Sequence, residues 1–560
     1  EDSTEHCPQG YASTPKLKTL QDKPQPAKKP NFVLILLDDQ DEMVSPYLEA
    51  MPFTRELFEK NGTRFTQAFS STSLCCPARC QLLTGLYGHN TGVLYNTGPY
   101  GGRRGFIHPR YTNGTRMKDE EGKCINNEYR DAASLLKENA NYASGIFGKY
   151  IAGVEYGEMG AKPPGWSAFH VGSDHKIYIG YQYSLYNWTE GMENIEYEYR
   201  NFDKSDYITD VIRDRALTFI DRQRETSTEK PMFLFMAPTA PHFPLNPAPR
   251  HKHMLGYWAS RYDQIVSSRP SFFNKTEILD SKSKWLKNSM DVRFNLKDHP
   301  FTKTDFVKRM TSLMAVDEMI ESLYRKLESY GEANNTIFVF SSDNGYNYGS
   351  HGLAHKQTPY EESVRVPLFI SGPGFPRGKN ISDLTLLIDV LPTFLESSGF
   401  QVPSYMDGFS LIPTMKGSEP KLQHERKAVL LEYKGLTPYY ANISMEHEIP
   451  RRYSAVNPPA GLVGQDTPPF KAIRTADHML VDYIYFYEDD FKNVGELVTD
   501  DVDTILAKTD HEYELYDLNK DPYQMNNLFK KVGKDSDLFK KLHADLKKLQ
   551  KCHGKNCYEL

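Results

Sequence analysis

Two short polar stretches that follow apolar runs are the first candidates for chemistry in this 560-residue chain. Asp38 and Asp39 come directly after the run 32–37, and Asp343 and Asn344 directly follow the strand-like run 337–342. Such runs are typical of buried strands, and ligands of open α/β sheets bind at the carboxyl ends of strands. Carboxylate and amide oxygens suit a hard cation, Ca²⁺ or Mg²⁺. Either stretch alone would indicate a cap or a turn, but the two together favour a metal site.

A cysteine-rich segment supplies the second candidate. Residues 73–85 read SLCCPARCQLLTG, with Pro77 where a first helical turn accepts proline and a leucine pair on the buried face. This pattern places Cys75 at a helix N-terminus, where unpaired N–H groups and the helix dipole attract an oxyanion. Arg79 lies about one turn further along the same face and adds a fixed positive charge. A zinc site would need a second pair of ligands at suitable spacing, and the neighbouring histidines are not so arranged.

The elements that must position these residues alternate between strand and helix. Apolar strands alternating with helices predict an α/β fold with a mixed, mostly parallel sheet between helices. The predicted strands are Asn31–Leu37, Tyr142–Phe147, Pro231–Ala237 and Thr336–Ser341, and the predicted helices are Met51–Lys60, Asp131–Asn139, Ile208–Arg222 and Asp305–Tyr330.

The pattern divides the chain into three units. Residues 1–30 form an N-terminal extension, and residues 31–420 form the large α/β domain. Within this domain, residues 244–300 are rich in Arg, Lys, His and aromatics and are predicted to be an irregular insertion. Residues 421–560 are predicted to form a smaller α+β domain with an antiparallel sheet. Its strand-like segments are Tyr453–Phe486 and Glu512–Leu518, and its amphipathic helix is Leu538–Lys551.

Composition excludes some classes of partner. The chain has 67 Lys plus Arg against 73 Asp plus Glu, a net charge of −6, which argues against nucleic acid as its main partner. Its longest apolar runs fall far short of the ~20 residues of a membrane helix, so no membrane span is predicted. The composition makes no prediction about oligomeric state.

Several features favour the secretory pathway, with a secreted or lysosomal destination. The chain starts at Glu1 with a polar stretch, as expected of a mature chain after signal removal. Cys552 and Cys557 are spaced as a small disulfide loop, and the total of seven cysteines is odd. Asn-X-Ser/Thr acceptor triplets, which predict a glycoprotein, occur at Asn61, Asn113, Asn187, Asn274, Asn334, Asn380 and Asn442.

The cysteine segment resembles a known family. Cys75-Cys-Pro-Ala-Arg79, followed by Leu-Leu-Thr-Gly, matches the signature of the type I sulfatases. In that family a formylglycine-generating enzyme oxidises the first cysteine to formylglycine (3-oxoalanine) during export, and the aldehyde hydrate is the nucleophile. The resemblance implies an alkaline-phosphatase-like fold and one Ca²⁺ ion. Its implied ligands are residue 75 with Asp38, Asp39, Asp343 and Asn344.

Other positions extend the resemblance. Lys149 stands in the family's second signature, Ala240-Pro-His242 matches its catalytic histidine, and Lys356 its last lysine. His351 and His355, close to Lys356 in sequence, are predicted to bind substrate. Ile151 stands where many sulfatases carry histidine. The N-acetylglucosamine-6-sulfatases and extracellular endosulfatases also lack that histidine, so this branch is the closest in pattern.

We therefore expect a sulfuric ester hydrolase that acts on a sulfated sugar or glycan. The hypothesis is that Arg79, Lys149 and Lys356 neutralise the sulfate while His242 or Lys356 supplies a proton to the departing alcohol. Expulsion of sulfate would use an Asp ligand or His351 as the base. Conversion of Cys75 would leave 7 − 1 = 6 cysteines, an even set.

Three alternatives stay open from the sequence. One is a broad arylsulfatase that acts on small sulfated metabolites. A phosphomonoesterase or phosphodiesterase on the same scaffold would need two metal ions and more histidine ligands than the sequence displays. A secreted glycan-binding protein without catalysis would show substitutions among the catalytic positions, and none is present.

Overall fold

The computed structural model of the chain describes most of its length. The described residues are 7, 9–21, 28–43, 46–98, 100–111, 115–154, 162–227, 229–265, 281–287, 300–435, 467–485 and 510–560. No helix in this part of the chain is long and apolar enough to cross a membrane.

A ten-stranded mixed sheet organises the molecule. Its centre is a run of four parallel strands in the order β9-β1-β8-β4. These strands are β9 (Thr336–Ser342), β1 (Asn31–Leu37), β8 (Met232–Ala237) and β4 (Ala143–Gly148). Every residue of the four is buried, which explains why they read as continuous apolar runs in the sequence.

The flanks of the sheet contain its antiparallel pairs. β5 (Trp166–Gly172) is parallel to β4, and β6 (Ser184–Thr189) and β7 (Glu196–Tyr199) continue from it antiparallel. On the other flank, β12 (Leu368–Ser371) is antiparallel to β9 and to β2 (Thr63–Phe65). β13 (Lys379–Ile381) closes that edge parallel to β2. The prediction of a mixed, mostly parallel sheet is confirmed.

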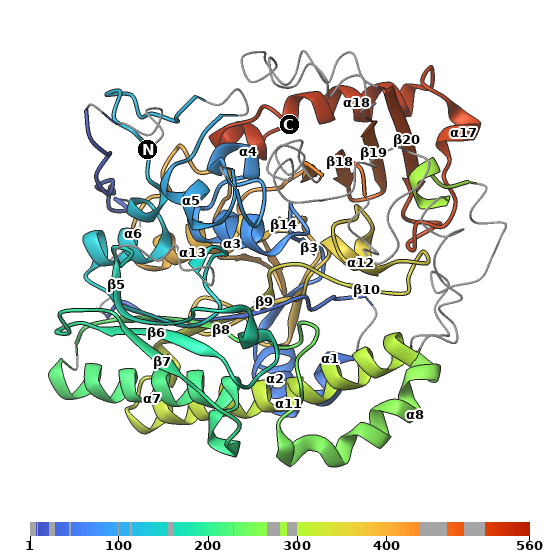
Figure 1. Ribbon diagram of the computed structural model, residues 1–560. Coiled ribbons are helices and arrows are strands. Elements are labelled where there is room, and N and C mark those ends of the chain that lie inside the picture. Colours follow the sequence, from blue (N-terminus) through green and yellow to red (C-terminus); the bar gives the residue numbers. More distant parts are fainter. Residues whose placement is uncertain are drawn as a thin grey trace, which may run out of the picture.

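Helices cover both faces of the large sheet (Figure 1). α7 (Ile208–Thr226) and α11 (Pro300–Ser329) lie on one face, and α3 (Cys75–Thr84), α6 (Ala132–Ala140) and α13 (Val390–Ser397) lie on the other. β1 shows how the strands serve two cores, because successive side chains of a strand point to opposite faces. Phe32, Leu34 and Leu36 belong to the core under α3, and Val33, Ile35 and Leu37 to the core under α11.

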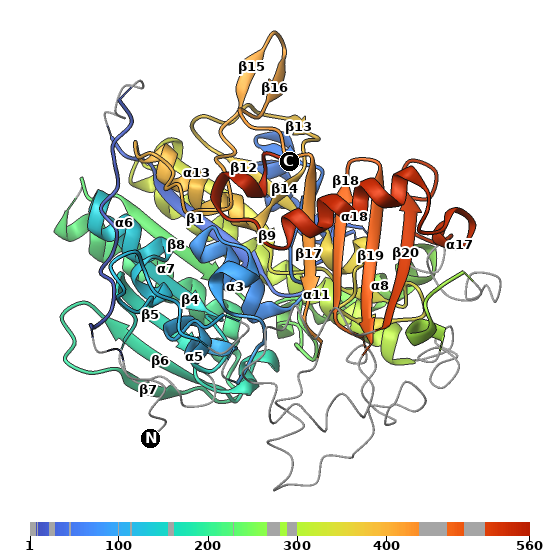
Figure 2. The same ribbon diagram turned by 90° about the horizontal axis from the view of Figure 1, so that it is seen from above.

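A second, four-stranded antiparallel sheet stands beside the large one (Figure 2). Its strands in order are β17 (Ala428–Tyr433), β18 (Phe470–Thr475), β19 (His478–Tyr485) and β20 (Asp510–Asp517). α18 (Asp537–Leu549) packs on this sheet through apolar residues such as Phe539 and Leu546. The antiparallel C-terminal sheet and its helix are as predicted. The domain boundary between residues 420 and 421 stays a prediction. Part of the strand-like segment 453–486 also stays a prediction, because residues 453–466 and 486 lie outside the described residues.

The segment 244–300 is not uniformly irregular, which corrects the sequence expectation. It contains the 3-10 helix η7 (Pro249–Met254) and α8 (Leu255–Ile265), and residues 284–287 form one further helical turn. Trp258 and Tyr262, one turn apart on α8, are buried in the core shared with α11. Only the basic composition of the segment suggested irregular structure; this i, i+4 aromatic pair was the helical signal.

Two disulfides form among the seven cysteines: one fastens the N-terminal segment to the body of the protein, and the other closes a short loop near the C-terminus. The C-terminal disulfide joins Cys552 to Cys557, and the long-range disulfide joins Cys7 to Cys124 across a separation of 117 residues. Cys75, Cys76 and Cys80 are buried free thiols. The remaining elements are α1 (Tyr47–Ala50), α2 (Pro52–Thr54), η2 (Arg55–Lys60), β3 (Ala68–Phe69), α4 (Gly88–Thr91), α5 (Gly102–Ile107), η3 (Asn127–Tyr129), η5 (His175–Tyr178), η6 (Lys204–Asp206), η9 (Ala333–Asn335), β10 (Asn347–Tyr348), β11 (Ala354–His355), α12 (Glu361–Val364), β14 (Thr385–Leu386), η10 (Leu387–Asp389), β15 (Thr414–Lys416), β16 (Glu419–Lys421), α17 (Phe529–Val532) and η12 (Gly554–Cys557).

Candidate active site

The four central parallel strands all end at the same edge of the sheet, and each is followed by predicted site residues. Adjacent parallel strands place the residues after their carboxyl ends side by side. Asp38 and Asp39 follow β1, Asp343 and Asn344 follow β9, Lys149 follows β4, and His242 lies in the loop after β8.

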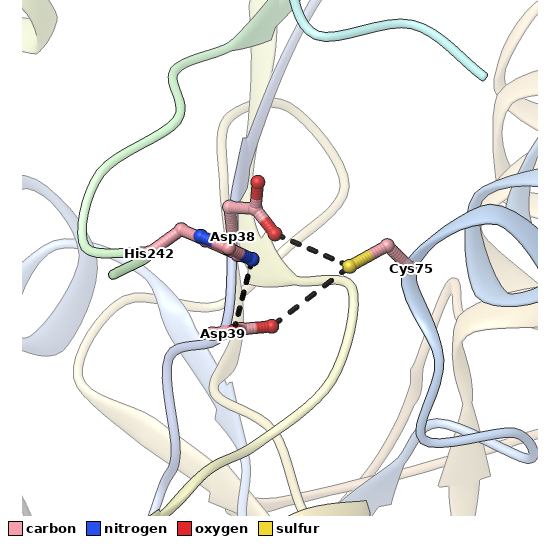
Figure 3. Close-up of side chains that lie close together, drawn as sticks. All are labelled: Asp38, Asp39, Cys75 and His242. Atoms are coloured by element: carbon pink, nitrogen blue, oxygen red, sulfur yellow. Dashed lines mark hydrogen bonds and ion pairs between the residues drawn. The ribbon is translucent and has the colours of Figure 1, made fainter. Parts of the chain in front are cut away.

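Both carboxylates that follow β1 face the thiol of Cys75 (Figure 3). Asp38 Oδ1 lies 3.5 Å and Asp39 Oδ1 3.9 Å from Cys75 Sγ. Successive side chains of an extended strand point to opposite faces, so the backbone must turn for both to face one site. It turns at Asp39, whose φ of 69° lies in the left-handed region. Both carboxylates are therefore directed at the side chain of residue 75.

Cys75 is the first residue of α3, as predicted. The N-cap residue Leu74 provides no side-chain hydrogen bond, but Asn96 Oδ1 accepts from the main-chain N–H of Cys76 at 3.0 Å. The positive end of the helix dipole is directed at the site. All ten residues of α3 are buried. Burial raises the pKa of the Cys75 thiol, which keeps the thiol protonated at neutral pH.

Each carboxylate in the cluster has a cationic partner. Lys149 Nζ lies 2.8 Å from Asp38 Oδ2, and Lys356 Nζ contacts Asp39 Oδ1. Burial alone would raise the pKa of Asp38, but Lys149 is the largest of the opposing influences that lower it to about 2. Burial has the same effect on Asp39, and Lys356 is the main group that lowers its pKa to about 2. Both side chains are therefore carboxylates at any ordinary pH.

Arg79 connects the third carboxylate to this network. Its Nε donates to Asp343 Oδ2 at 2.9 Å, and its Nη1 donates to the main-chain oxygen of Lys149 at 2.8 Å. Lys356 Nζ lies 2.6 Å from Cys75 Sγ, so a cation also faces the thiol directly. Three cations and three carboxylates thus surround the position of the predicted nucleophile.

His242 and Lys356 form the open side of the cluster. Their side chains are 24% and 12% exposed, whereas those of Asp38 and Asp39 are 0% and 3% exposed. His242 Nε2 lies 3.5 Å from Asp39 Oδ2, and its Nδ1 contacts the main-chain oxygen of Phe243. Burial of the ring lowers the pKa of His242 and outweighs the opposing effect of Asp39. The imidazole is therefore neutral at neutral pH.

The sequence did not point to Tyr178, which packs against two site residues. Its ring centroid is 4.4 Å from that of His242, and Lys149 Nζ lies 5.0 Å from the Tyr178 centroid. Tyr178 ends η5, between β5 and β6, in a segment without any motif. The neighbouring backbone is held in place, since Thr239 Oγ1 donates to the main-chain oxygen of Ile177 at 3.1 Å. No spacing rule could have linked Tyr178 to a histidine 64 residues later.

The oxygens of the cluster match the needs of a hard cation. Asp38, Asp39, Cys75 and His242 each offer an atom, and these atoms lie within 4.8 Å of one another. Asn344 is fully buried, and its Oδ1 has no hydrogen-bond partner among the described residues. A buried acceptor left without a partner costs about 1–3 kcal/mol, which a bound cation would remove. This orphan oxygen beside three carboxylates fits Ca²⁺ better than zinc.

The structure corrects the expectation that His351 binds substrate. Its side chain is fully buried, with Nε2 3.3 Å from Glu362 Oε2 and the ring stacked 3.9 Å from that of Tyr360. The backbone at His351 is left-handed, with φ of 56°, and the ring packs against α12. Tyr360 donates to Glu514 of the C-terminal sheet, so His351 belongs to the contact between the two sheets. The side chain of His355 lies outside the described residues.

The fold and this site define an alkaline-phosphatase-like α/β protein with a buried cluster of carboxylates and cations that could hold a metal ion. The chain belongs to the sulfatase family, which it matches over residues 30–400. Residues 349–457 also match the C-terminal region of N-sulphoglucosamine sulphohydrolase.

Curated relatives support this membership, and a solved structure shares the fold. The extracellular sulfatase SULF-1 homolog of Drosophila melanogaster is 31% identical over 389 residues, which cover 69% of this chain and 31% of the fly protein. The chain thus spans about a third of the length of that relative. N-acetylglucosamine-6-sulfatase of Capra hircus is 27% identical over 542 residues, covering 95% of this chain and 85% of the goat enzyme. One solved structure shows a protein in complex with its substrate D-glucosamine-2-N,6-O-disulfate. It matches this chain with a TM-score of 0.64 at 22% identity, covers 94% of this chain and 98% of its own, and shows that the two share a fold.

Proposed function

We propose that this protein is a sulfatase that hydrolyses sulfate esters of a glucosamine-type sugar, with a formylglycine at position 75 and one Ca²⁺ ion. The observation that supports this most strongly is the meeting of Asp38, Asp39, Lys149 and Lys356 around residue 75 at the N-terminus of α3. These residues come from segments far apart in the sequence, and their convergence is what sulfate ester cleavage requires.

The proposed cofactors fit the residues present. Asp38, Asp39, Asp343 and Asn344 would hold the ion, which would supply a fixed double positive charge for the sulfate oxygens. Oxidised to an aldehyde and hydrated, residue 75 would supply the nucleophilic hydroxyl. The unmodified thiol is a poor nucleophile because burial raises its pKa.

The chain's own cations would bind and polarise the sulfate ester. Lys149, Lys356 and Arg79 are fixed by carboxylates rather than by solvent, so little reorganisation accompanies the reaction. Removal of one such preorganised charge typically lowers kcat by about 10²–10³.

Two groups at the open side would handle protons. Burial alone would lower the pKa of Lys356, but Asp39 and neighbouring groups raise it. Lys356 therefore stays protonated and can stabilise the departing alcohol oxygen. His242 is neutral and can accept a proton at Nε2, because its Nδ1 faces a main-chain carbonyl. Because their surroundings shift the two pKa values in opposite directions, Lys356 is suited to act as the acid and His242 as the base.

The proposed sugar specificity rests on the similarity to named relatives and on the residues at the open side of the cluster. The goat relative is named for N-acetylglucosamine-6-sulfate, and it covers nearly the whole chain. Ile151 is buried in the core, so that position holds no polar group for the substrate, as in the branch that the sequence resembles. The aromatic face of Tyr178, next to His242, would bound the sugar side of the pocket. The alternative is hydrolysis of small aryl sulfates by the same residues.

We propose that the protein passes through the secretory pathway. The fly relative is named an extracellular sulfatase, and the long-range and C-terminal disulfides suit an oxidising compartment. Because all of α3 is buried, a formylglycine-generating enzyme would have to act before the chain folds. Of the predicted glycan acceptors, Asn334 and Asn380 are exposed and Asn61 is half-buried, while Asn187 is 6% exposed and bonded to Glu198. Asn113, Asn274 and Asn442 lie outside the described residues.

The test compares sulfate release with the chemical state of residue 75. Protein from a host able to form formylglycine should release sulfate from N-acetylglucosamine-6-sulfate faster than from iduronate-2-sulfate or an aryl sulfate. Mass spectrometry of the peptide should show an aldehyde at position 75. Cys75→Ser should abolish turnover, while Cys76→Ser, at the adjacent buried thiol, should keep it.

Several results would contradict the proposal. An unmodified thiol in active protein would overturn the nucleophile. Aldehyde at position 75 without release of sulfate from any ester would point to a glycan-binding protein. Equal rates on all three esters would favour the arylsulfatase alternative.

A further inference from the structure

Arg309 is a buried charge beneath the Asp38–Asp39 turn that no motif identified. It lies on α11, on the face of the sheet opposite α3, and is 1% exposed. Its Nη2 donates to the main-chain oxygen of Asp39, and its Nε donates to the hydroxyl of Tyr348 at 2.8 Å. The guanidinium also lies over two tyrosine rings, 4.1 Å from the centroid of Tyr346 and 5.0 Å from that of Tyr348.

A fully buried guanidinium is costly unless it is paired and hydrogen-bonded. Burial lowers the pKa of Arg309, but Tyr348 and Asp305 outweigh this and raise it, so the group stays charged. Its hydrogen bond goes to the backbone of the one residue that turns the strand end. A non-glycine residue in a left-handed conformation is itself strained, by about 1–3 kcal/mol, and persists only where its surroundings hold it.

The other contacts of Asp39 come from the site side of the turn, where its main-chain N–H donates to Asp343 Oδ1 at 3.2 Å. Asn344 Nδ2 donates to Asp39 Oδ1 at 2.7 Å, and Lys356 contacts the same oxygen. These partners face the reaction side of the turn, whereas Arg309 reaches its carbonyl from α11. The carbonyl contact is therefore separate from the network that would bind sulfate.

We propose that Arg309 is a positioning residue for the metal site, an inference that rests on the proposed function. By holding the Asp39 carbonyl, Arg309 fixes the turn that brings two successive carboxylates, Asp38 and Asp39, to one side of the chain. Loss of this hold lets the turn relax toward extended backbone, in which the two carboxylates would point to opposite faces. Arg309 contacts neither the ion nor the substrate and acts through Asp39.

The test is the Ca²⁺ affinity of full-length Arg309→Lys protein. Lysine keeps the charge but cannot donate to the Asp39 carbonyl and Tyr348 as a planar fork while stacking on both rings. Ca²⁺ titrations of chelator-stripped protein, followed by calorimetry, should show affinity about 10- to 100-fold weaker than wild type, as is typical when residues that orient metal ligands are changed. kcat should fall together with the Ca²⁺ affinity. KM for the sulfate ester, measured at saturating Ca²⁺, should change little.

Arg426 provides a matched control. It is also fully buried, and its guanidinium forms a bidentate pair with Asp389 at 2.7 and 2.8 Å. Arg426→Lys should lower the melting temperature yet leave Ca²⁺ affinity within about twofold of wild type, because its partner is not among the metal-site residues. Tyr348→Phe removes only one hydroxyl from Arg309 and serves if Arg309→Lys fails to fold; it should weaken Ca²⁺ binding several-fold.

The outcomes separate this inference from the proposed function. Wild-type affinity in both Arg309→Lys and Tyr348→Phe, or an equal loss in Arg426→Lys, overturns the positioning role. A wild-type protein that binds no Ca²⁺ also overturns it. If wild-type protein binds Ca²⁺ but releases no sulfate, the proposed function fails, while a selective loss of affinity in Arg309→Lys still supports the positioning role.

Discussion

Removal of Ca²⁺ should weaken the binding of inorganic sulfate by about 30- to 300-fold. Without a metal ion, the three carboxylates of Asp38, Asp39 and Asp343 are balanced by three cations, those of Lys149, Lys356 and Arg79, and His242 is neutral. The charges of this cluster therefore cancel, and its cations are already engaged. A bound divalent ion would take over the carboxylates and leave the cluster with a net charge of about +2.

The magnitude follows from Coulomb's law and the size of the site. The candidate ligand atoms span 4.8 Å, which we take as the separation between the ion and sulfate. In a medium as polarisable as water, charges of +2 and −2 at that separation attract by about 3.5 kcal/mol. Screening over a Debye length of about 8 Å at physiological salt reduces this to about 2 kcal/mol. These limits correspond to about 300-fold and about 30-fold in affinity.

Isothermal titration of sulfate into the protein, with Ca²⁺ or with chelator at matched ionic strength, measures the effect. Linkage requires that sulfate tighten Ca²⁺ binding by the same factor, so the reverse titration is an internal check. Asp343→Asn, which removes one negative charge, should bind sulfate more tightly than wild type in chelator. A ratio of sulfate affinities near one would refute the charge-cancellation argument.

Three further predictions concern stability and the open side of the site. Burial alone would raise the pKa of Glu432, but His89 lowers it to about 2, while Glu432 raises the pKa of His89 against the effect of burial. The pair should contribute fully between about pH 4.5 and 6.5, and its contribution should fade as pH falls toward 2 or rises through the raised pKa of His89. Glu432→Gln should thus cost about 3–5 kcal/mol of unfolding free energy at pH 5.5, and chemical denaturation should show a smaller cost at pH 9. Tyr178→Ala should lower kcat about 2- to 10-fold by freeing the ring of His242, and steady-state kinetics of Tyr178→Phe should match wild type if the ring alone matters. Serine replacement of the long-range disulfide should cost about 5 kcal/mol and that of the C-terminal disulfide about 2 kcal/mol, because the first closes a far longer loop; equal shifts in denaturant midpoint would contradict this.

Local patterns in the sequence were enough to predict the four central strands of the large sheet and the residues at their ends. β1 could be predicted because both of its faces are buried, which makes the run apolar throughout, and Asp38 ends it abruptly. The start of α3 could be predicted because Pro77 and Cys75 fit the first turn of a helix. Since parallel strands align their carboxyl ends, the meeting of the residues after β1 and β9 followed from the fold class alone.

Contacts between distant segments that do not follow from the alignment of parallel strands could not be predicted. The partner of Cys7 lies 117 residues away, and no spacing rule identifies it. Sequence proximity to Lys356 suggested a site role for His351, but the left-handed turn at His351 directs its ring to Tyr360. In the sequence, Arg309 cannot be told apart from an arginine on the exposed face of a helix. Only the packing of α11 on the sheet shows that it contacts Asp39.

The structure also narrows the choice of base for the proposed release of sulfate. Ile151 is 1% exposed and packs in the core, and His351 lies at the contact between the two sheets, so neither can serve. Asp38 and Asp39 both face residue 75, but with pKa values of about 2 they bind protons weakly, and a metal ion would weaken them further. Among the described residues in contact with this cluster, His242 is the neutral group with a lone pair toward it. His242 is therefore the base that the geometry favours.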